Sequence, residues 1–407
     1  MRIVIITGVF IPEPVVSARL LAELAERLTA DYKVTILRPH PTRPLGFVPK
    51  PLDNSQLPYE IVELDSFTCP QSNIIGRFKE SISMGKACCE YLESHKEEIG
   101  FVYNSPWHLF GRKAVAEWCQ KNHVPNMTPV QDIYPESLLS KLPKIGVVQW
   151  LVKKLLMPYD LITLRNANKI HTISDKMADY LSKTRKIDRN RFVVVRNWQD
   201  EREFVQYKKL HESEESIEAP FTFMYMGNVG KLAGLETVLD AYAVADGMEN
   251  TRLVIAGSGP AKEGLQQKAS GISNRKIEFW EVPFGEVPAT QAKADVMMLP
   301  VMKGFASSSI PSKLPAYMFS AKPVLASVDT DSDTAMCIKN AKAGFVCEPE
   351  NPVVLAKLMQ QVANTPKDEL AAMGKRGFDY AINDFSRTEN LQKLYKAVVE
   401  VIESGKK

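Results

Sequence analysis

Residues 294–328 read ADVMMLPVMKGFASSSIPSKLPAYMFSAKPVLASV and decide the fold of the C-terminal half of the chain. Residues 295–300 form an apolar run bounded by a charge and a proline, which predicts a buried strand. Residues 324–328 form a second such run. Between the two, a helix opens at Ser312 and ends at a Lys-Pro step. Two buried strands joined through one helix are the repeating unit of an α/β protein with a parallel sheet.

The loop of this unit has the composition of an anion site. Ser307, Ser308 and Ser309 precede the helix, and Ser312 and Lys313 open it. Free backbone N–H groups and the positive end of the helix dipole favour an anion here, and the lysine adds a full positive charge. Open α/β sheets bind ligands at the carboxyl ends of their strands. The pattern therefore predicts an anionic ligand, and the alternative is a serine-capped helix with a surface lysine.

Composition restricts the class of protein. The chain has 407 residues, too many for one core, so two domains are expected. The net charge is only +3, which argues against a nucleic-acid partner. The six cysteines show no C-x-x-C spacing, so we expect neither a zinc site nor a disulfide framework, and a reducing cytoplasm fits best. No stretch reaches the roughly 18 apolar residues of a membrane span.

The first half of the chain starts with the same alternation of strands and helices. Residues 3–6 predict a strand, Gly8 a tight turn, Ser17 the start of a helix, and residues 33–37 the next strand. The proline-rich stretch 39–58 is expected to form a long loop, and loops of that length are usually functional or mobile.

Three titratable residues follow predicted strands of this half. His108 comes after the strand predicted at 101–103, and Asp132 and Glu136 flank a proline turn. The carboxyl ends of parallel strands meet at one edge of a sheet, so these three residues are the catalytic candidates there. The alternatives are a structural histidine and a turn followed by a helix cap.

The segment 144–166, KIGVVQWLVKKLLMPYDLITLRN, predicts a basic amphipathic helix. Trp150 lies near its centre, and lysine and arginine residues surround its apolar positions. Such a helix can lie in the interface of an anionic membrane. We expect peripheral membrane association through this segment, with ordinary core packing as the alternative.

A change of composition marks the domain boundary. Residues 203–220 are charged and poor in large apolar side chains, which is typical of a linker. We therefore place an N-terminal domain at residues 1–200 and a C-terminal domain at residues 201–384. The last helix, about 385–407, is expected to pack back on the N-terminal domain.

The C-terminal domain has a glycine loop after its first predicted strand. Gly227 and Gly230 allow the backbone to approach a ligand, Asn228 lies between them, and Lys231 can pair with a phosphate. The spacing is not G-x-G-x-x-G, so a dinucleotide fingerprint is not supported. Val282, which follows a later strand, is placed to flank a nucleotide base.

The acidic run DTDSD at residues 329–333 has two interpretations. It lacks the glycine and glutamate of an EF-hand loop. A D-x-D site that binds a metal-diphosphate is one interpretation. We favour a cap on the helix that starts near Asp333.

Taken together, these residues resemble the GT-B glycosyltransferases, and within them the large retaining family called family 4. The branch it resembles builds bacterial capsule, exopolysaccharide and O-antigen, and includes the colanic-acid and L-N-acetylfucosamine transferases. The resemblance runs over nearly the whole chain. It is carried by Phe10-Ile-Pro-Glu with Ser17 and Arg19, Gln131-Asp-Ile-Tyr-Pro-Glu-Ser, Ile173-Ser-Asp-Lys-Met, Arg196-Asn-Trp, Tyr225-Met-Gly-Asn-Val-Gly-Lys, and Pro311-Ser-Lys-Leu with Tyr317-Met and Lys322-Pro-Val.

The resemblance implies two Rossmann-like domains facing across a cleft, with the nucleotide-sugar donor held mainly by the C-terminal one. No metal or other cofactor would be needed, because lysines and a helix N-terminus can stabilise the departing diphosphate. Ser17 and Arg19 would lie on the acceptor side. The donor would be surrounded by Gly227, Asn228, Gly230, Lys231, Val282, Ser308, Ser309, Ser312 and Lys313.

The implied activity is transfer of a sugar, with retention, from a nucleotide diphosphate to a hydroxyl of a lipid-linked glycan. A UDP-sugar is the favoured donor. The implied location is the cytoplasm, at the inner face of the cytoplasmic membrane. The implied role is in the synthesis of a cell-surface polysaccharide.

Two departures from the family pattern leave alternatives open. The family commonly has a glutamate pair spaced E-x7-E, and the matching positions here are Ser308 and Ala316. A serine can hydrogen-bond a sugar hydroxyl, but an alanine cannot hold a ribose. Pro14-Val15-Val16 also replaces a glycine pair. The alternatives are a catalytically impaired GT-B scaffold that partners an active transferase, and a GT-B sugar-nucleotide epimerase.

Overall fold

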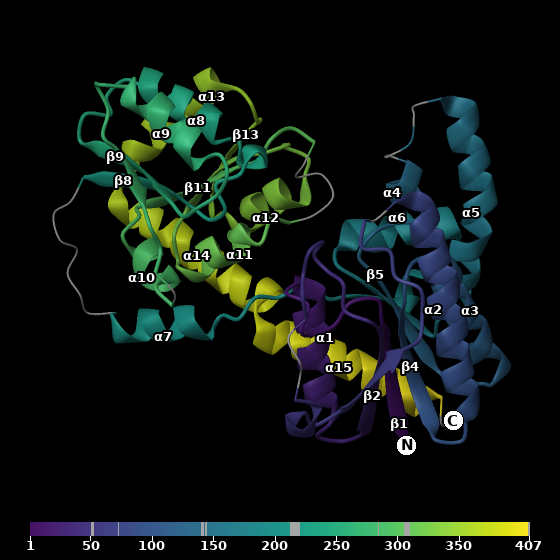
Figure 1. Cartoon of the computed structure of the whole chain (residues 1–407). Coiled ribbons are helices and arrows are strands. Elements are labelled where there is room, and N and C mark those ends of the chain that lie inside the picture. The colour runs from purple at the N-terminus through teal and green to yellow at the C-terminus, as the bar shows by residue number, and fades with distance from the viewer. Residues whose placement is uncertain are drawn as a thin grey trace. The chain divides into compact units, whose positions relative to one another are not determined.

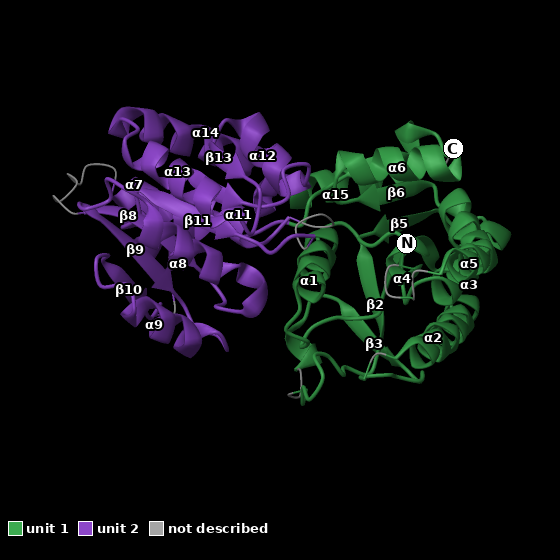
Figure 2. Ribbon diagram, turned by 90° about the horizontal axis from the view of Figure 1, so that it is seen from above, with its two compact units in different colours: residues 1–197, 390–407 green, residues 198–389 purple. Residues whose placement is uncertain are grey.

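The chain forms two compact α/β units (Figure 1). One unit contains residues 1–197 and 390–407, and the other contains residues 198–389 (Figure 2). Each unit has one sheet in which every strand pair is parallel. The computed structural model describes all residues except 50–52, 72, 140–141, 143–144, 212–219, 284, 305–309 and 406–407.

The sheet of the first unit has the strand order β3-β2-β1-β4-β5-β6-β7. Its core strands are continuous apolar runs because both faces of the sheet are covered. The order reverses between β1 and β4, and such a switch point is where doubly wound sheets bind ligands. The strands are β1 (Arg2–Thr7), β2 (Lys33–Pro39), β3 (Glu60–Leu64), β4 (Ile99–Ser105), β5 (Asn126–Val130), β6 (Lys169–Thr172) and β7 (Phe192–Val194).

Helices cover both faces of this sheet (Figure 2). The C-terminal helix α15 (Arg387–Ser404) contacts α1, because the Tyr395 hydroxyl donates to Asp31 at 2.7 Å and the Arg27 guanidinium lies 3.8 Å from the Tyr395 ring centroid. The other helices of this unit are α1 (Val16–Leu28), α2 (Ile74–Ser94), α3 (Phe110–Lys121), α4 (Glu136–Leu139), α5 (Gly146–Asn166) and α6 (Asp175–Arg185), with the 3-10 turns η1 (Asn54–Gln56) and η2 (Arg189–Arg191).

The second unit repeats the architecture, with the strand order β10-β9-β8-β11-β12-β13 and a switch point between β8 and β11. Its strands are β8 (Phe221–Met226), β9 (Thr251–Ala256), β10 (Ile277–Trp280), β11 (Val296–Pro300), β12 (Val324–Ser327) and β13 (Gly344–Cys347). Its helices are α7 (Arg202–Leu210), α8 (Leu235–Val244), α9 (Lys262–Ser270), α10 (Val287–Ala292), α11 (Lys313–Phe319), α12 (Asp333–Ala341), α13 (Pro352–Ala363) and α14 (Lys367–Phe385), with the 3-10 turn η3 (Lys231–Ala233).

One prediction about this unit was wrong. The stretch 203–220 was expected to be a linker, yet its first part lies in helix α7. Phe204 is 4% exposed, and its ring packs against that of Phe319 with centroids 5.8 Å apart. A single buried aromatic residue anchors this helix, although the average composition of the stretch is polar. Residues 212–219 of the predicted linker lie outside the described part of the chain.

The acidic run before α12 acts as a helix cap. The Ser332 hydroxyl accepts the N–H of Ala335 at 3.2 Å, and Asp333 lies in the first turn. This arrangement stabilises the start of the helix. Among the residues that the structure describes, no helix is long and apolar enough to cross a membrane.

Candidate functional site

In the second unit, three glycines pack backbone against backbone where β8 and β9 end. Gly227, Gly257 and Gly259 have φ angles of 149°, 129° and 155°, a region that favours glycine. A Cβ on Gly257 would lie 2.2 Å from the carbonyl oxygen of Gly227, and a Cβ on Gly259 would lie 2.4 Å from that of Val229. Side chains are therefore excluded here, because the backbones of the two loops fill the space that a Cβ would take. Gly257 and Gly259 were missed as site residues because an isolated G-x-G is a weak signal.

Lys313 lies against this glycine cluster. A Cβ on Gly227 would lie 2.5 Å from Lys313 Cε, so the lysine passes directly over the glycine. Lys313 Nζ is 5.5 Å from the Tyr225 ring centroid, and it makes no hydrogen bond or ion pair with any described residue. Burial lowers the pKa of Lys313. A half-buried cation without a counter-charge is costly, and none of the described residues supplies one, which makes this lysine a candidate partner for an anionic ligand.

Two tyrosines hold the loops in place. The Tyr317 hydroxyl donates to the carbonyl of Met226 at 2.8 Å and accepts its N–H at 3.0 Å. The Tyr225 hydroxyl donates to the carbonyl of Asn228 at 2.6 Å. Met226 ends β8, whereas Tyr317 lies on α11, which follows β11. The hydrogen bonds of Tyr317 therefore lock the two sides of the switch point together.

The other residues predicted for this site have different positions. Gly230 precedes η3, and Lys231 is exposed in that turn. Ser312 is the N-cap residue of α11, but its side chain makes no capping hydrogen bond. Val282 packs against the hydrophobic core beside Trp280. Ser308 and Ser309 lie outside the described residues.

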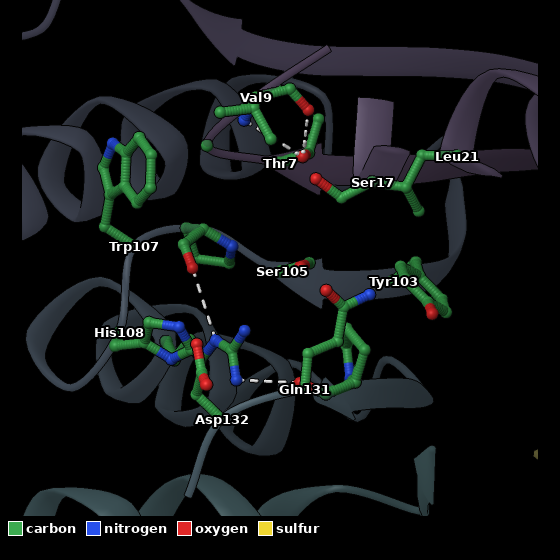
Figure 3. Close-up of a pocket in the computed structure, with 14 residues that line it drawn as sticks. Thr7, Val9, Ser17, Leu21, Tyr103, Ser105, Trp107, His108, Gln131 and Asp132 are labelled. Atoms are coloured by element: carbon green, nitrogen blue, oxygen red, sulfur yellow. Dashed lines mark hydrogen bonds between the residues drawn. The ribbon is translucent and has the colours of Figure 1, made fainter. Parts of the chain in front are cut away.

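The first unit has a pocket at its own switch point (Figure 3). Thr7 at the end of β1 and Ser105 at the end of β4 lie on its wall, and residues that follow β5 complete it. Of the predicted residues, Ser17, His108 and Asp132 line this pocket. Arg19 is not among the lining residues, and its guanidinium donates to Glu23 at 2.9 Å.

His108 is held as a neutral ring. It stacks on Tyr134, with centroids 4.3 Å apart and planes at 18°. Burial lowers the pKa of His108 well below its ordinary value, and the positive charge of Arg112 lowers it further. The imidazole is therefore neutral near pH 7 and can exchange a hydrogen bond with a sugar hydroxyl. Asp132 is exposed, and its carboxylate has no hydrogen-bond partner among the described residues.

Glu136 has a different environment. Its two oxygens accept hydrogen bonds from Nη1 and Nη2 of Arg185, both at 2.8 Å. Burial by itself would raise the pKa of Glu136, but the hydrogen bonds and charge of Arg185 outweigh it, so the pKa lies below its ordinary value. Arg185 also donates to Asp160 at 2.8 Å and to the carbonyl of Tyr134 at 2.8 Å. Glu136 is thus anchored beneath the turn that carries Asp132.

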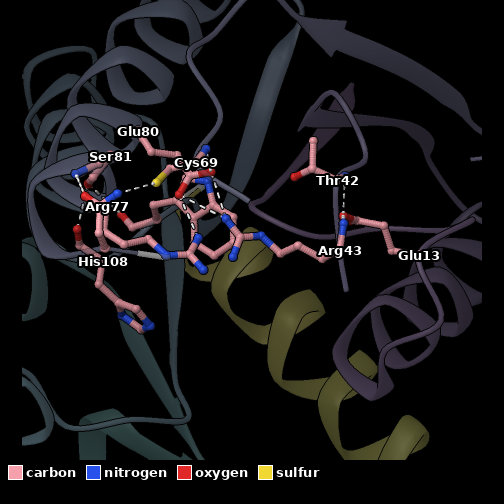
Figure 4. Close-up of polar contacts among 11 residues, drawn as sticks. Glu13, Thr42, Arg43, Cys69, Arg77, Glu80, Ser81 and His108 are labelled. Carbon is pink, nitrogen blue, oxygen red and sulfur yellow. Dashed lines mark hydrogen bonds and ion pairs between the residues drawn. The ribbon is translucent and has the colours of Figure 1, made fainter. Parts of the chain in front are cut away.

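A polar network fixes one wall of the pocket (Figure 4). Glu80 accepts hydrogen bonds from Arg43 at 2.8 and 3.0 Å and from Arg77 at 2.7 Å. Both guanidinium groups lie over Trp107, at 4.3 and 5.0 Å from a ring centroid. Glu13 accepts the backbone N–H of Arg43 at 2.8 Å and so ties the long proline-rich loop to the loop after β1. Trp107 lines the pocket, and this network keeps its indole in place.

Part of the second unit matches a known protein family. Residues 220–365 match the family described as glycosyl transferases group 1. This match includes the glycine cluster and Lys313. The second unit is therefore similar to a glycosyltransferase group 1 domain over these residues.

Sequence comparisons with individual proteins also find glycosyltransferases. The chain is 24% identical over 285 residues to a probable glycosyltransferase, WbjE of Pseudomonas aeruginosa, and the match covers 68% of each chain. It is 26% identical over 153 residues, 37% of each chain, to a putative colanic acid biosynthesis glycosyl transferase, WcaI of Escherichia coli.

The fold is that of solved GT-B structures. HepE from Anabaena, solved in complex with UDP, superposes with a TM-score of 0.65 over 98% of this chain and 100% of its own, at 14% identity. The predicted α/β fold with two Rossmann-like units is thereby confirmed. The family match and the homologues support a glycosyltransferase.

Proposed function

We propose that this protein is a retaining glycosyltransferase that moves a sugar from a UDP-sugar to a hydroxyl of a lipid-linked glycan. The acceptor would belong to a cell-surface polysaccharide, made at the inner face of the cytoplasmic membrane. The observation that carries the proposal is Lys313, a half-buried lysine that pairs with no described carboxylate and lies over Gly227 within the matched residues 220–365. The UDP complex of HepE and the colanic-acid description of WcaI support the donor and the polysaccharide class.

The residues of the second unit have distinct roles in this proposal. The backbone N–H of Gly230 approaches the diphosphate, whereas the N–H of Gly227 already donates to the carbonyl of Ala256 at 3.0 Å and this glycine only leaves room beside Lys313. Lys313 neutralises the diphosphate, and Lys231 adds a second charge from solvent. This positive charge stabilises the leaving UDP in the way that a metal does in other transferases. For retention, an oxygen of the departing diphosphate accepts the proton of the attacking acceptor hydroxyl on the same face of the sugar.

In the first unit, Asp132 and His108 face the acceptor within the pocket. Neutral His108 positions the attacking hydroxyl by a hydrogen bond, and Asp132 stabilises positive charge that develops at the sugar ring. Glu136 acts through the turn that it anchors and is a positioning residue. Ser17 binds a hydroxyl of the acceptor, and Arg19 lies on the same helix outside the pocket.

A thermal-shift series tests the donor class. UDP is expected to raise the melting temperature more than GDP, CMP or dTDP, equally with and without magnesium, because a ligand of the native state stabilises it. Release of UDP from UDP-sugars in the presence of a lipid-linked acceptor then tests turnover. A shift with no nucleotide would refute the proposal. Ala316 lies in the apolar core at the position of a family glutamate, so UDP binding without turnover would favour the scaffold alternative.

The Lys313→Met substitution is expected to weaken UDP binding by roughly 10- to 100-fold, the value of a charged hydrogen bond of about 1.5 to 3 kcal/mol. The melting temperature without ligand should be unchanged or higher, because a buried charge is removed. Isothermal titration calorimetry and thermal unfolding measure the two effects.

Lys322→Met is the matched control. Lys322 is also a buried lysine with a pKa lowered by burial, but its Nζ donates to the carbonyl of Ala292 at 2.8 Å. This variant should lose stability and keep its UDP affinity. Unchanged UDP affinity in Lys313→Met would remove Lys313 from the site.

The proposed membrane contact is the first half of α5. Trp150 is 61% and Leu155 is 66% exposed, with Val147 and Leu151 exposed beside them, whereas Leu156 is buried. The alternative expected from the sequence was ordinary core packing. It holds for Leu156 but not for its exposed neighbours. Lys154 lies over the Trp150 ring at 4.9 Å from the centroid, so positive charge accompanies the apolar surface. This combination fits an anionic lipid interface.

Replacing both Leu151 and Leu155 by glutamate is expected to weaken binding to phosphatidylglycerol vesicles by at least ~10-fold, because each leucine loses its apolar contact with lipid. Co-sedimentation with vesicles measures the change. Val353→Glu, at an exposed position on α13, should leave binding unaltered. Equal binding of all three proteins would exclude α5 as the contact.

A further inference from the structure

Arg112, in the first turns of α3, is a buried cation on the pocket wall of the first unit. Only 9% of the residue is exposed. Its Nε donates to the carbonyl of Pro106 at 3.3 Å and its Nη1 to the carbonyl of Pro129 at 2.7 Å. Burial lowers the pKa of Arg112 to about 10, so the side chain is still charged near pH 7. Nη2 makes no hydrogen bond with any described residue, and Arg112 lines the pocket.

No described carboxylate forms an ion pair with Arg112 within 4.0 Å. The charges of Asp160 and Asp132 act on Arg112 from a greater distance, that of Asp160 more strongly, and neither carboxylate accepts a hydrogen bond from it. Carbonyl groups satisfy two donor groups without neutralising the charge. A buried charge that lacks a partner costs several kcal/mol, and such sites concentrate where ligands bind.

Arg185, another buried arginine of this unit, provides a contrast. Its side chain has 0% exposure, and two carboxylates, Glu136 and Asp160, bind it at 2.8 Å. Arg185 is thus paired directly with two carboxylates, whereas Arg112 faces a pocket with no described carboxylate within ion-pair distance. A purely structural role for Arg112, joining the ends of β4 and β5, accounts for Nε and Nη1 but not for Nη2.

We propose that the first-unit pocket binds an anionic group of the acceptor, a carboxylate or a phosphate attached to a sugar ring, through Nη2 of Arg112. The hydroxyls of Ser17 and Ser105 lie in the same pocket, and neither has a side-chain partner among the described residues, so they receive the ring hydroxyls. Asp132 lies at the exposed rim of the pocket. This inference rests on the proposed function, because it names the chemical class of that enzyme's acceptor.

Ligand-observed NMR on the full chain tests the inference. The probes are glucuronate, glucose 6-phosphate and glucose, which differ only in the charged group at C6. At least one anionic sugar is expected to bind ~10-fold or more tightly than glucose, as a charged hydrogen bond provides. Tighter binding of glucuronate identifies an acidic sugar, and tighter binding of glucose 6-phosphate identifies a sugar phosphate. Equal affinity for all three sugars, or binding of none, would overturn the proposal.

Substitutions of Arg112 test whether this residue causes the preference for an anionic sugar. Arg112→Gln should abolish the preference for the anion, and Arg112→Lys should retain part of it. Arg189→Gln, at a half-exposed arginine outside the pocket, should keep it in full. A preference that survives in Arg112→Gln refutes the assignment. Circular dichroism and an unchanged melting temperature without ligand show that each variant is folded. The absence of a UDP-induced rise in the melting temperature of the wild type would refute the proposed function independently of the acceptor result.

A second measurement does not depend on folding of the variants. Arg112 lowers the pKa of His108, so an anion bound at Arg112 should raise it. The imidazole resonances of His108 in the wild-type protein, titrated with and without the bound anionic sugar, report that shift. A pKa of His108 that does not move when the anionic sugar binds would place the anion away from Arg112.

Discussion

Replacing Arg185 with methionine is expected to lower the free energy of unfolding of the first unit by about 3 to 5 kcal/mol. Its guanidinium holds Glu136 and Asp160, each at 2.8 Å, and the carbonyl of Tyr134. Without the arginine, the partly buried carboxylates of Glu136 and Asp160, whose side chains are 23% and 14% exposed, lose their guanidinium partner. A calorimetric melting temperature lower by roughly 10 °C would correspond to this loss.

The control is another arginine with two acidic partners. Arg189 binds Asp175 at 2.9 Å and Asp179 at 2.8 Å, but the arginine side chain is 38% exposed. Solvent screens these pairs, so Arg189→Met should cost at most about 1 kcal/mol. Equal losses for the two substitutions would show that burial does not determine the strength of the Arg185 cluster.

The size of the Arg185→Met effect should depend on pH. Burial already raises the pKa of Asp160, and loss of the arginine should raise the pKa values of both carboxyl groups above those of the unfolded chain. Acids with raised pKa values contribute stability that is present at low pH and is lost as the pH rises through the folded pKa. The variant should therefore differ more from wild type near pH 8 than near pH 5.

This cluster also bears on activity. Glu136 and the Tyr134 carbonyl hold the turn that carries Asp132, so a displaced turn should reduce turnover even where the unit is folded. Combining Arg185→Met with Glu136→Gln and Asp160→Asn removes the unpaired charges and should recover much of the stability. Full recovery of stability without recovery of turnover would identify the turn as a positioning element.

The second large effect is expected from Gly257→Ala. Its φ of 129° disfavours any side chain, and the new Cβ would lie 2.2 Å from the carbonyl oxygen of Gly227. Backbone strain and steric overlap together should cost about 3 kcal/mol or more. Because the displaced atom belongs to the loop beneath Lys313, UDP affinity should fall as well. Denaturant unfolding and calorimetric titration with UDP measure the two losses.

Gly247→Ala separates strain from overlap. Gly247 has a φ of 66°, but a Cβ there would have no neighbour within 4 Å. This variant should lose only about 1 kcal/mol and bind UDP normally. If Gly257→Ala behaved in the same way, the close packing of the two glycine loops would have no energetic importance.

Much of the fold could be predicted from the sequence, because buried parallel strands are continuous apolar runs. Residues 324–328 and the run before the serine loop show this in the second unit, and residues 3–6 show it in the first. The linker prediction for residues 203–220 was wrong because one buried aromatic side chain, Phe204, anchors a helix in a stretch whose average composition is polar. The periodicity of apolar residues indicates which face of an element is buried, but it does not reveal a helix that is held by one buried side chain.

The sequence by itself determined the two parallel α/β units, the glycine loop at Gly227 and the position of Lys313 at the start of a helix, since these depend on local patterns. Only the tertiary structure decided which charges have partners. Glu136 is neutralised by Arg185, whereas Arg112 and Lys313 form no ion pair with any residue in the described part of the chain. Electrostatic pairing depends on distances between residues far apart in the chain, and spacing along a sequence does not contain those distances.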